Sequence, residues 1–398
     1  MTFRWANGHP PPVALVDLIQ VFALAKPDGG NPQITATPEM KARILAFADR
    51  YVGESPVFNK LKKLVVGLRD GEVFFITDRV PTSSKEKFKF ELMLQHANTA
   101  PENYKPDDLS MFSALLDHYD FDRHGNGTRK IFGETAQHLK RCRFCQRGVA
   151  DGATFKQKAH AIPEGFGNKG LVLAEECDEC NGAFGRGIEP ALLRFLDPQR
   201  VFVSTRGKGG LLDVQLKGGQ MGSEGKLMKV AARSITKTDD GFLADVGSMR
   251  FVPIDCYKAL CKMALSVMKS HELAALQETI RWVRFGDHAG LIVPKVATNI
   301  LYFPAETSPE VTVYVRKAPS SELPHVVGEF RLGCFMYVFA LPLSAEDEAL
   351  PLDFFERERF KEIFQHYQRT GAWSKIDFNN YDSIELRTTM RMVQRDSS

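Results

Sequence analysis

The sequence lacks an apolar run long enough to cross a bilayer, and its first residues lack the hydrophobic centre of a signal peptide. The two most apolar stretches, VALVDLIQVFALA and CFMYVFALPL, are too short to span a membrane. The opening MTFRWANGHPPP has no hydrophobic core. These absences exclude a membrane-spanning protein and give no sign of secretion, so we expect a cytoplasmic protein.

Cysteine is scarce and odd in number, with seven in 398 residues. That favours a reduced compartment over a disulfide framework. Four of the seven form two CxxC pairs, Cys142 with Cys145 and Cys177 with Cys180, which 31 residues separate. Two such turns can complete a tetrahedral thiolate site suited to Zn²⁺, and four thiolates leave no position for water. We therefore expect structural zinc; the wide separation of the pairs argues against thioredoxin-like redox chemistry.

Neither sign of charge dominates, because 52 Lys and Arg stand against 49 Asp and Glu, a formal net charge of +3. The distribution is uneven, however. Residues 123–174 hold ten basic and three acidic side chains, and such an excess attracts a polyanion. We expect DNA as the partner, with phosphate contacts from Arg141, Arg143 and Lys158.

The length predicts two or three domains. Residues 1–120 read as a mostly helical region of unknown function, with GEVFFITDRV as its clear strand. Residues 201–398 alternate strand-like segments with glycine turns around one long helix, which predicts an α+β region with an antiparallel sheet. The glycine-rich 207–226 contains no GxxxxGK followed by Ser or Thr, so it predicts hairpin turns rather than a phosphate loop. On the long helix, Lys258, Lys262 and Lys269 lie off the apolar stripe and predict a solvated basic face.

Between these regions, residues 121–200 carry the cysteines and a compact pattern. The strand-like ATFKQKAHAI precedes the turn PEGFGNKG, the short strand LVLA and, after the second CxxC, the helical NGAFGRGIEPALLRFL. Strand, loop, strand and helix of this size bury too little surface to be stable alone. We expect the zinc to fasten the two ends of the segment.

The motifs CRFC, KAHAIPEGFGNKG and ECDECN, in this order, resemble the HNH nuclease superfamily over about residues 138–200. The resemblance implies a ββα-metal module with two zinc knuckles. It implies that His160 is the general base that activates water, that Asn168 braces the loop, and that Asn181 is a ligand of a catalytic Mg²⁺ or Mn²⁺. Each residue also has a structural interpretation: a strand-capping histidine, a turn asparagine and a helix N-cap, respectively.

Ala159 departs from the family pattern, in which an acid that binds the catalytic metal often precedes the histidine. Another carboxylate is then needed. Among the nearby acids we favour Glu189, which follows Asn181 on the helical arm. The candidates are Glu164, Glu176, Asp178 and Glu189.

Two functions fit these observations. The first is a metal-dependent HNH endonuclease that hydrolyses DNA, such as the effector of a bacterial defence or restriction system. Its outer regions would then choose the substrate, assemble a homo-oligomer or receive a separate sensor or regulatory partner. The alternative is a zinc-stabilised nucleic-acid-binding protein that has lost catalysis, for which Ala159 is the argument.

Overall fold

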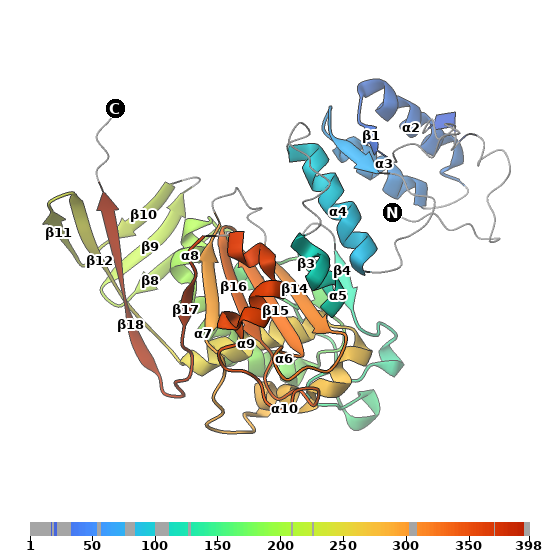
Figure 1. Ribbon diagram of the computed structural model, residues 1–398. Helices are drawn as coiled ribbons and strands as arrows, with labels where there is room; N and C mark the ends of the chain where they lie inside the picture. The colour runs from blue at the N-terminus through green and yellow to red at the C-terminus, as the bar shows by residue number, and fades with distance from the viewer. Residues whose placement is uncertain are drawn as a thin grey trace. The chain divides into compact units, whose positions relative to one another are not determined.

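The computed structural model describes residues 17, 20, 21, 33–53, 57–75, 84–99, 111–125, 129–207, 210–224, 227–301, 309–369 and 371–393. The chain divides into two compact units, Met1–Ser110 and Met111–Ser398 (Figure 1). The predicted segments 121–200 and 201–398 both lie in the second unit. Apolar residues at helical spacing over 13–24 predict a helix, and that segment lies almost wholly outside the described residues.

The described part of the first unit is mostly helical, as the sequence predicts. It contains α2 (Pro38–Tyr51), α3 (Val57–Gly67) and α4 (Ser84–Thr99), with a two-stranded antiparallel sheet of β1 (Gln33–Thr35) and β2 (Val73–Phe75). Thr37 starts α2, because its side-chain oxygen accepts a hydrogen bond from the backbone N–H of Met40. The core of this unit lies between α2 and α3 and is formed by Ile44, Phe47, Ala48, Tyr51, Phe58, Leu61 and Val65.

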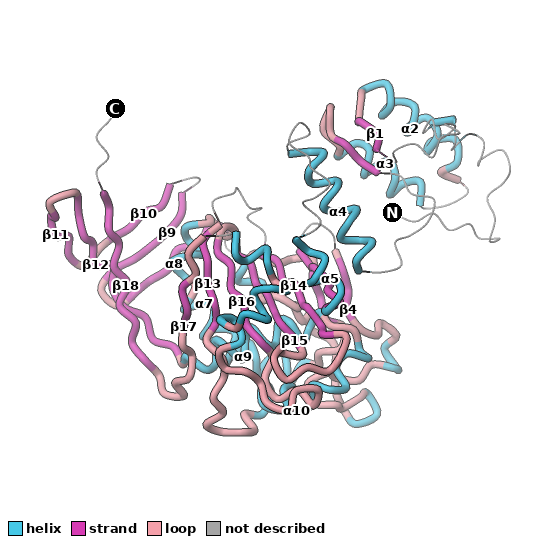
Figure 2. The backbone as a smooth tube through the Cα atoms, viewed as in Figure 1, coloured by secondary structure: helices cyan, strands magenta, loops and turns pink. Residues whose placement is uncertain are grey.

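The second unit is built on a six-stranded sheet in which every neighbouring pair is antiparallel. Figure 2 shows these strands running side by side. In spatial order they are β17 (Ser374–Ile376), β13 (Val296–Ile300), β16 (Phe335–Ala340), β15 (Val326–Leu332), β14 (Pro309–Arg316) and β3 (Tyr119–Gly125). The antiparallel sheet and the mixed α+β class are thus as predicted.

Both faces of this sheet are buried, and successive residues alternate between two cores. On β16, Tyr337 and Phe339 belong to the larger core, whereas Met336 and Val338 belong to the smaller one. Helix α9 (Pro253–Val267) packs on the larger-core face, against β14 and β15, and α7 (Ile188–Phe195) packs on α9. The smaller core also contains residues of α5 (Ser113–His118) and α11 (Glu358–Ile363).

Besides the six-stranded sheet, the second unit contains a parallel pair, β4 (Lys130–Phe132) with β5 (Leu171–Leu173), and a short antiparallel pair, β6 (Arg206–Gly207) with β7 (Gly210–Leu211). The second unit also contains two three-stranded antiparallel sheets (Figure 2). One contains β8 (Asp213–Leu216), β9 (Gly219–Glu224) and β10 (Leu227–Ala231), and the other β11 (Ser234–Thr238), β12 (Gly241–Phe251) and β18 (Ile384–Val393). The glycine-rich segment therefore forms hairpins, as predicted. Within the described residues, no helix is both long and apolar enough to cross a membrane.

Two segments differ from what their local sequence predicts. The glycine-bearing DFDRHGNG (120–127) predicts a turn, but most of it belongs to the edge strand β3, which pairs with β14. The start of the strand-like RVFVSTRGKGG, at 200–202, predicts a strand, but it ends α8 (Asp197–Phe202), whose first turn contains Pro198 and which buries Val201. In both cases, tertiary packing overrides the local pattern.

Candidate metal centre and histidine site

The four cysteines of the two CxxC pairs converge, and all their sulfur atoms lie within 4.8 Å of one another. Cys145 Sγ and Cys177 Sγ are 3.7 Å apart, close to the edge of about 3.8 Å expected for a tetrahedron with Zn–S bonds of about 2.3 Å. Three of the four thiols are buried, and Cys145 is partly exposed. A donor set of four sulfurs fits structural Zn²⁺, as predicted.

The backbone around the cysteines is arranged to stabilise thiolates. Cys177 is the N-cap of α6 (Asp178–Arg186), and its Sγ accepts from the backbone N–H of Cys180 at 3.5 Å. Cys142 Sγ accepts from the backbone N–H of Cys177 at 3.4 Å. These N–H groups, together with the positive end of the helix, favour the charged form of sulfur that a metal requires.

An arginine from far along the chain also reaches the cluster. Arg284, on α10 (Gln277–Phe285), donates its Nε–H to Cys180 Sγ at 3.0 Å, across 104 residues of sequence. Its Nη2 lies 3.3 Å from Glu179 Oε1. A positive group hydrogen-bonded to a ligand sulfur offsets part of the negative charge of a four-thiolate site. No sequence spacing pointed to Arg284, because only the packing of α10 brings it here.

The loop, the second strand and the helix occur in the predicted order, but the predicted first strand, ATFKQKAHAI, is reduced to one isolated β-bridge at His160. Residues 159–162 pair antiparallel with β5 (Leu171–Leu173): Ala161 N–H donates to Leu171 O at 3.1 Å, and Leu173 N–H donates to Ala159 O at 3.0 Å. His160 lies opposite Val172 in this hairpin. β5 then leads through Cys177 into α6, so the metal cluster joins the start of the helix to the earlier CxxC turn.

Asn168 closes the loop of this hairpin. Its side-chain Nδ2 donates to the carbonyls of Ile162 (2.7 Å) and Leu171 (3.0 Å). Its Oδ1 accepts from the backbone N–H groups of Gly170 (3.1 Å) and Leu171 (2.9 Å). The side chain is completely buried, so it braces the loop rather than facing a substrate. Gly167, at φ +89°, supplies the left-handed turn that precedes it.

His160 is mostly buried, with about 15 % of its side chain exposed. Its Nε2 is 3.8 Å from Glu164 Oε2. Its Nδ1 is buried and has no hydrogen-bond partner within the described part of the chain. Burial, and then the positive charge of Lys158, lower the pKa of the imidazole below its ordinary value. The ring is therefore neutral at neutral pH, the form that can accept a proton.

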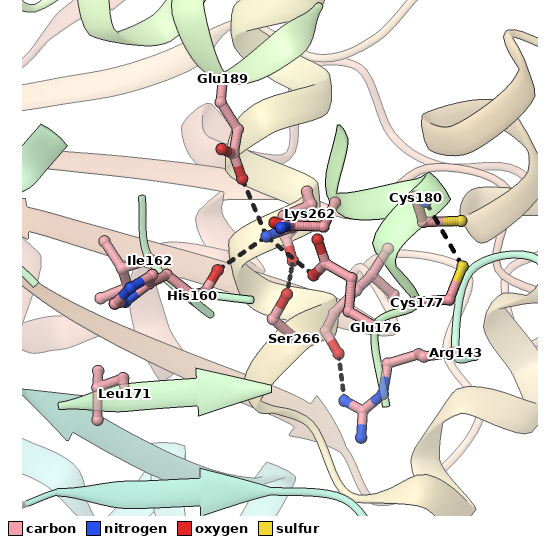
Figure 3. Close-up of polar contacts among 12 residues, drawn as sticks. Arg143, His160, Ile162, Leu171, Glu176, Cys177, Cys180, Glu189, Lys262 and Ser266 are labelled. Carbon is pink, nitrogen blue, oxygen red and sulfur yellow. Dashed lines mark hydrogen bonds and ion pairs between the residues drawn. The ribbon is translucent and has the colours of Figure 1, made fainter. Parts of the chain in front are cut away.

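A buried lysine of α9, Lys262, contacts the backbone of His160 (Figure 3). Lys262 Nζ donates to the backbone carbonyl of His160 at 2.9 Å and lies 3.0 Å from Glu189 Oε1. Glu176 Oε2 is 3.1 Å away, as an ion pair without hydrogen-bond geometry. Burial opposes the charge on Lys262, but the two carboxylates outweigh it and raise the pKa of the ammonium.

The predicted solvated basic face of α9 is wrong. Lys262 is only 1 % exposed, and Lys258 is also buried, with its ammonium over the ring of Trp282. Lys269 is half-exposed, 2.7 Å from Asp122. The helix is covered by the sheet and by α7, so even positions off the apolar stripe face protein. Their partners come from distant segments that local periodicity cannot show.

The other predicted residues lie near this cluster in different roles. Asn181, in the first turn of α6, donates to Gln157 Oε1 at 3.1 Å, three residues before His160. Asp178 accepts from Thr154 Oγ1 at 2.6 Å and from the backbone of Gln157 at 2.8 Å, so it fixes the chain leading to His160. The pairing of Glu189 with Lys262 competes with its predicted role as a metal ligand.

Of the three predicted phosphate contacts, Arg141 and Lys158 are exposed and Arg143 is not. Arg143 Nη1 donates to the carbonyls of Leu265 (2.6 Å) and Met268 (2.9 Å), and its Nη2 pairs with Glu175 at 3.0 Å. It therefore satisfies carbonyls at the end of α9. The predicted phosphate contact of Arg143 is therefore wrong. Its buried side chain connects the first cysteine turn to α9 and cannot reach DNA at the surface.

No protein-family model, curated protein or solved structure matches this chain.

Proposed function

We propose that this protein is a metal-dependent endonuclease of the HNH type, with His160 as the general base that activates water for attack on a DNA phosphodiester. The observation that carries the proposal is the segment of hairpin loop, strand β5 and helix α6, closed by a four-cysteine cluster, with a partly exposed, neutral histidine bridged to β5. Acid–base chemistry near neutral pH needs a histidine in this form.

The side chains around His160 support distinct roles. Asn168 keeps the loop closed, and the exposed Arg141 and Lys158 attract the phosphate backbone. A catalytic Mg²⁺ or Mn²⁺ would supply charge stabilisation at the phosphate. Glu164 Oε2 lies 3.8 Å from His160 Nε2, and Asn181 contacts Gln157, three residues before the histidine. Glu189 is paired with Lys262, which competes with metal binding, so we propose Glu164, next to the His160 ring, as the replacement for the acid missing at Ala159.

The direct test is incubation of the purified protein with supercoiled plasmid and Mg²⁺ or Mn²⁺, with and without EDTA. We expect nicked and linear DNA only with the divalent ion. Zinc content is measured in each reaction, and excess Mg²⁺ is added back after chelation. Restored cleavage with constant zinc assigns the requirement to a second metal, while an intact plasmid under all conditions contradicts the proposal.

A zinc-stabilised DNA-binding protein without catalysis is the second candidate. Ala159 favours it, because this residue is buried and an alanine side chain has no oxygen that could bind a metal. Both candidates predict DNA binding, so cleavage alone separates them. A role in a bacterial defence or restriction system, and assembly with a second copy or a regulatory partner, belong to the first candidate and rest on the family resemblance.

DNA binding is expected to depend on Arg141 and Lys158. Replacing both with Gln should weaken binding at low salt and make the negative slope of log K against log salt shallower by about two, roughly one for each phosphate left without its cationic side chain. Fluorescence anisotropy of a labelled duplex at several salt concentrations measures this slope. The matched control is Arg357→Gln with Lys361→Gln, which removes the same charge from the region of α11. Equal slopes for the two double variants would place the DNA elsewhere.

A further inference from the structure

On the basis of the nuclease function proposed above, we propose that Lys262 is a positioning residue that holds the backbone of His160 in place from helix α9. Figure 3 shows its ammonium between the His160 carbonyl, Glu189 and Glu176. The lysine and the histidine are 102 residues apart in sequence. The site is therefore completed by a helix outside the segment that resembles the nuclease family.

The geometry of the hairpin explains why the His160 carbonyl needs a partner. In an antiparallel pair, the backbone groups of alternate residues point toward the neighbouring strand. Ala159 O and Ala161 N–H bond to β5, so the carbonyl of His160 points away from it. A buried carbonyl without a partner is costly. Lys262 provides the donor, at 2.9 Å.

His160 thus lies next to two side-chain clamps. Lys262 holds its own carbonyl, and Asn168 holds the carbonyl of Ile162, two residues later. The segment 159–162 makes few backbone hydrogen bonds to β5, so these two side-chain contacts fix its position. A general base must stay within hydrogen-bond reach of the water that it activates.

The composition of the cluster supports a role beyond packing. A buried charge group of this kind rarely adds stability compared with apolar side chains of the same size. Here one lysine serves two carboxylates and one carbonyl, all three within 3.1 Å. Glu176 is completely buried, whereas the Glu189 side chain is 16 % exposed. The cluster therefore extends from the core to the partly open surface at His160.

The test compares Glu176→Gln with the double variant Glu176→Gln/Lys262→Met. Lys262→Met alone would leave the Glu176 carboxylate buried and unpaired, which endangers folding, whereas the pair of changes removes the buried carboxylate together with its cation and leaves only the partly exposed Glu189 charged. Lys258→Met is the control for removing a buried lysine from α9. Three quantities are measured: kcat and KM on plasmid DNA, zinc per chain, and hydrogen–deuterium exchange of residues 159–173.

In the double variant we expect kcat to fall by about 100-fold, the size of effect that a 1 Å misplacement produces. KM and zinc content should remain close to those of Glu176→Gln, and exchange at 159–173 should accelerate. Lys258→Met should behave like the wild type in all three measurements. In a His160→Ala background, the Lys262 change should add no further loss, because both act through the same group.

An unchanged kcat in the double variant, or an equal additional loss in the His160→Ala background, would overturn the proposal. If the wild-type protein cleaves no DNA under any condition, the nuclease function fails, and the exchange measurement then decides about Lys262 by itself. Faster exchange at 159–173 in the double variant, with none in Lys258→Met, supports the clamp. Unchanged exchange contradicts it.

Discussion

The variant His160→Ala is expected to lose DNA cleavage by at least about 100-fold, the usual contribution of a positioned general base. A general base acts in the chemical step alone, so on the proposed mechanism folding, zinc content and DNA affinity should remain near wild type. Its ring makes no hydrogen bond that holds the described structure together, because Nδ1 lacks a partner and Nε2 is 3.8 Å from Glu164. Single-turnover cleavage of saturating plasmid measures the loss directly.

The matched control is His138→Ala, which removes an exposed histidine from the same unit. It should cleave at the wild-type rate. If His160→Ala cleaves as fast as His138→Ala, His160 is not the base and the proposed nuclease site is wrong. If it loses both cleavage and zinc, the change has damaged the fold rather than the chemistry.

Cys180→Ser is expected to release the zinc and to destabilise the second unit. The free energy of metal binding at such a site is also free energy of folding. The removal of one buried ligand should cost about 4 kcal/mol or more, which lowers Tm by roughly 10 °C in a unit of this size. Zinc per chain, measured by atomic emission, and the thermal transition, followed by circular dichroism, give the two values.

Cys334→Ser provides the control, because this cysteine lies outside the four-cysteine cluster. It should keep both the zinc and the wild-type Tm. A Cys180→Ser protein that still holds one tightly bound zinc per chain would refute the assignment of four sulfur ligands. If Cys180→Ser and Cys334→Ser lower Tm equally and neither changes the zinc content, the two cysteines contribute through packing alone.

The sequence predicted the features that depend on neighbours along the chain. The spacing within each CxxC pair and the turn around Asn168 are local, and the structure brings the cysteines together and closes that turn. The alternation of valine along β14 and the continuous apolar run of β16 likewise predict strands without knowledge of their partners.

The sequence failed where a charged side chain meets a partner from another segment. Arg143 and Lys262 were both expected at the surface because arginine and lysine are rarely buried. Each is buried because α9 supplies backbone carbonyls to Arg143 and lies against the carboxylates that pair with Lys262. Arg284 was missed for the same reason. One sequence read by local pattern carries no information about contacts across more than 100 residues.

The place of β3 in the sheet has a consequence for synthesis and for protein engineering. β3 leaves the ribosome before the cysteine turns, but it pairs with β14, and Arg123 and Glu310 at this junction are 187 residues apart. The segment with the four cysteines therefore lies, in sequence, between two strands that can pair only after β14 has been synthesised. This long-range pairing raises the contact order of the unit and slows its folding. A fragment ending near residue 200 would keep all four cysteines, yet it would lack β14, α9 and the lysine that neutralises Glu176. We expect such a minimal fragment to bind zinc and to aggregate.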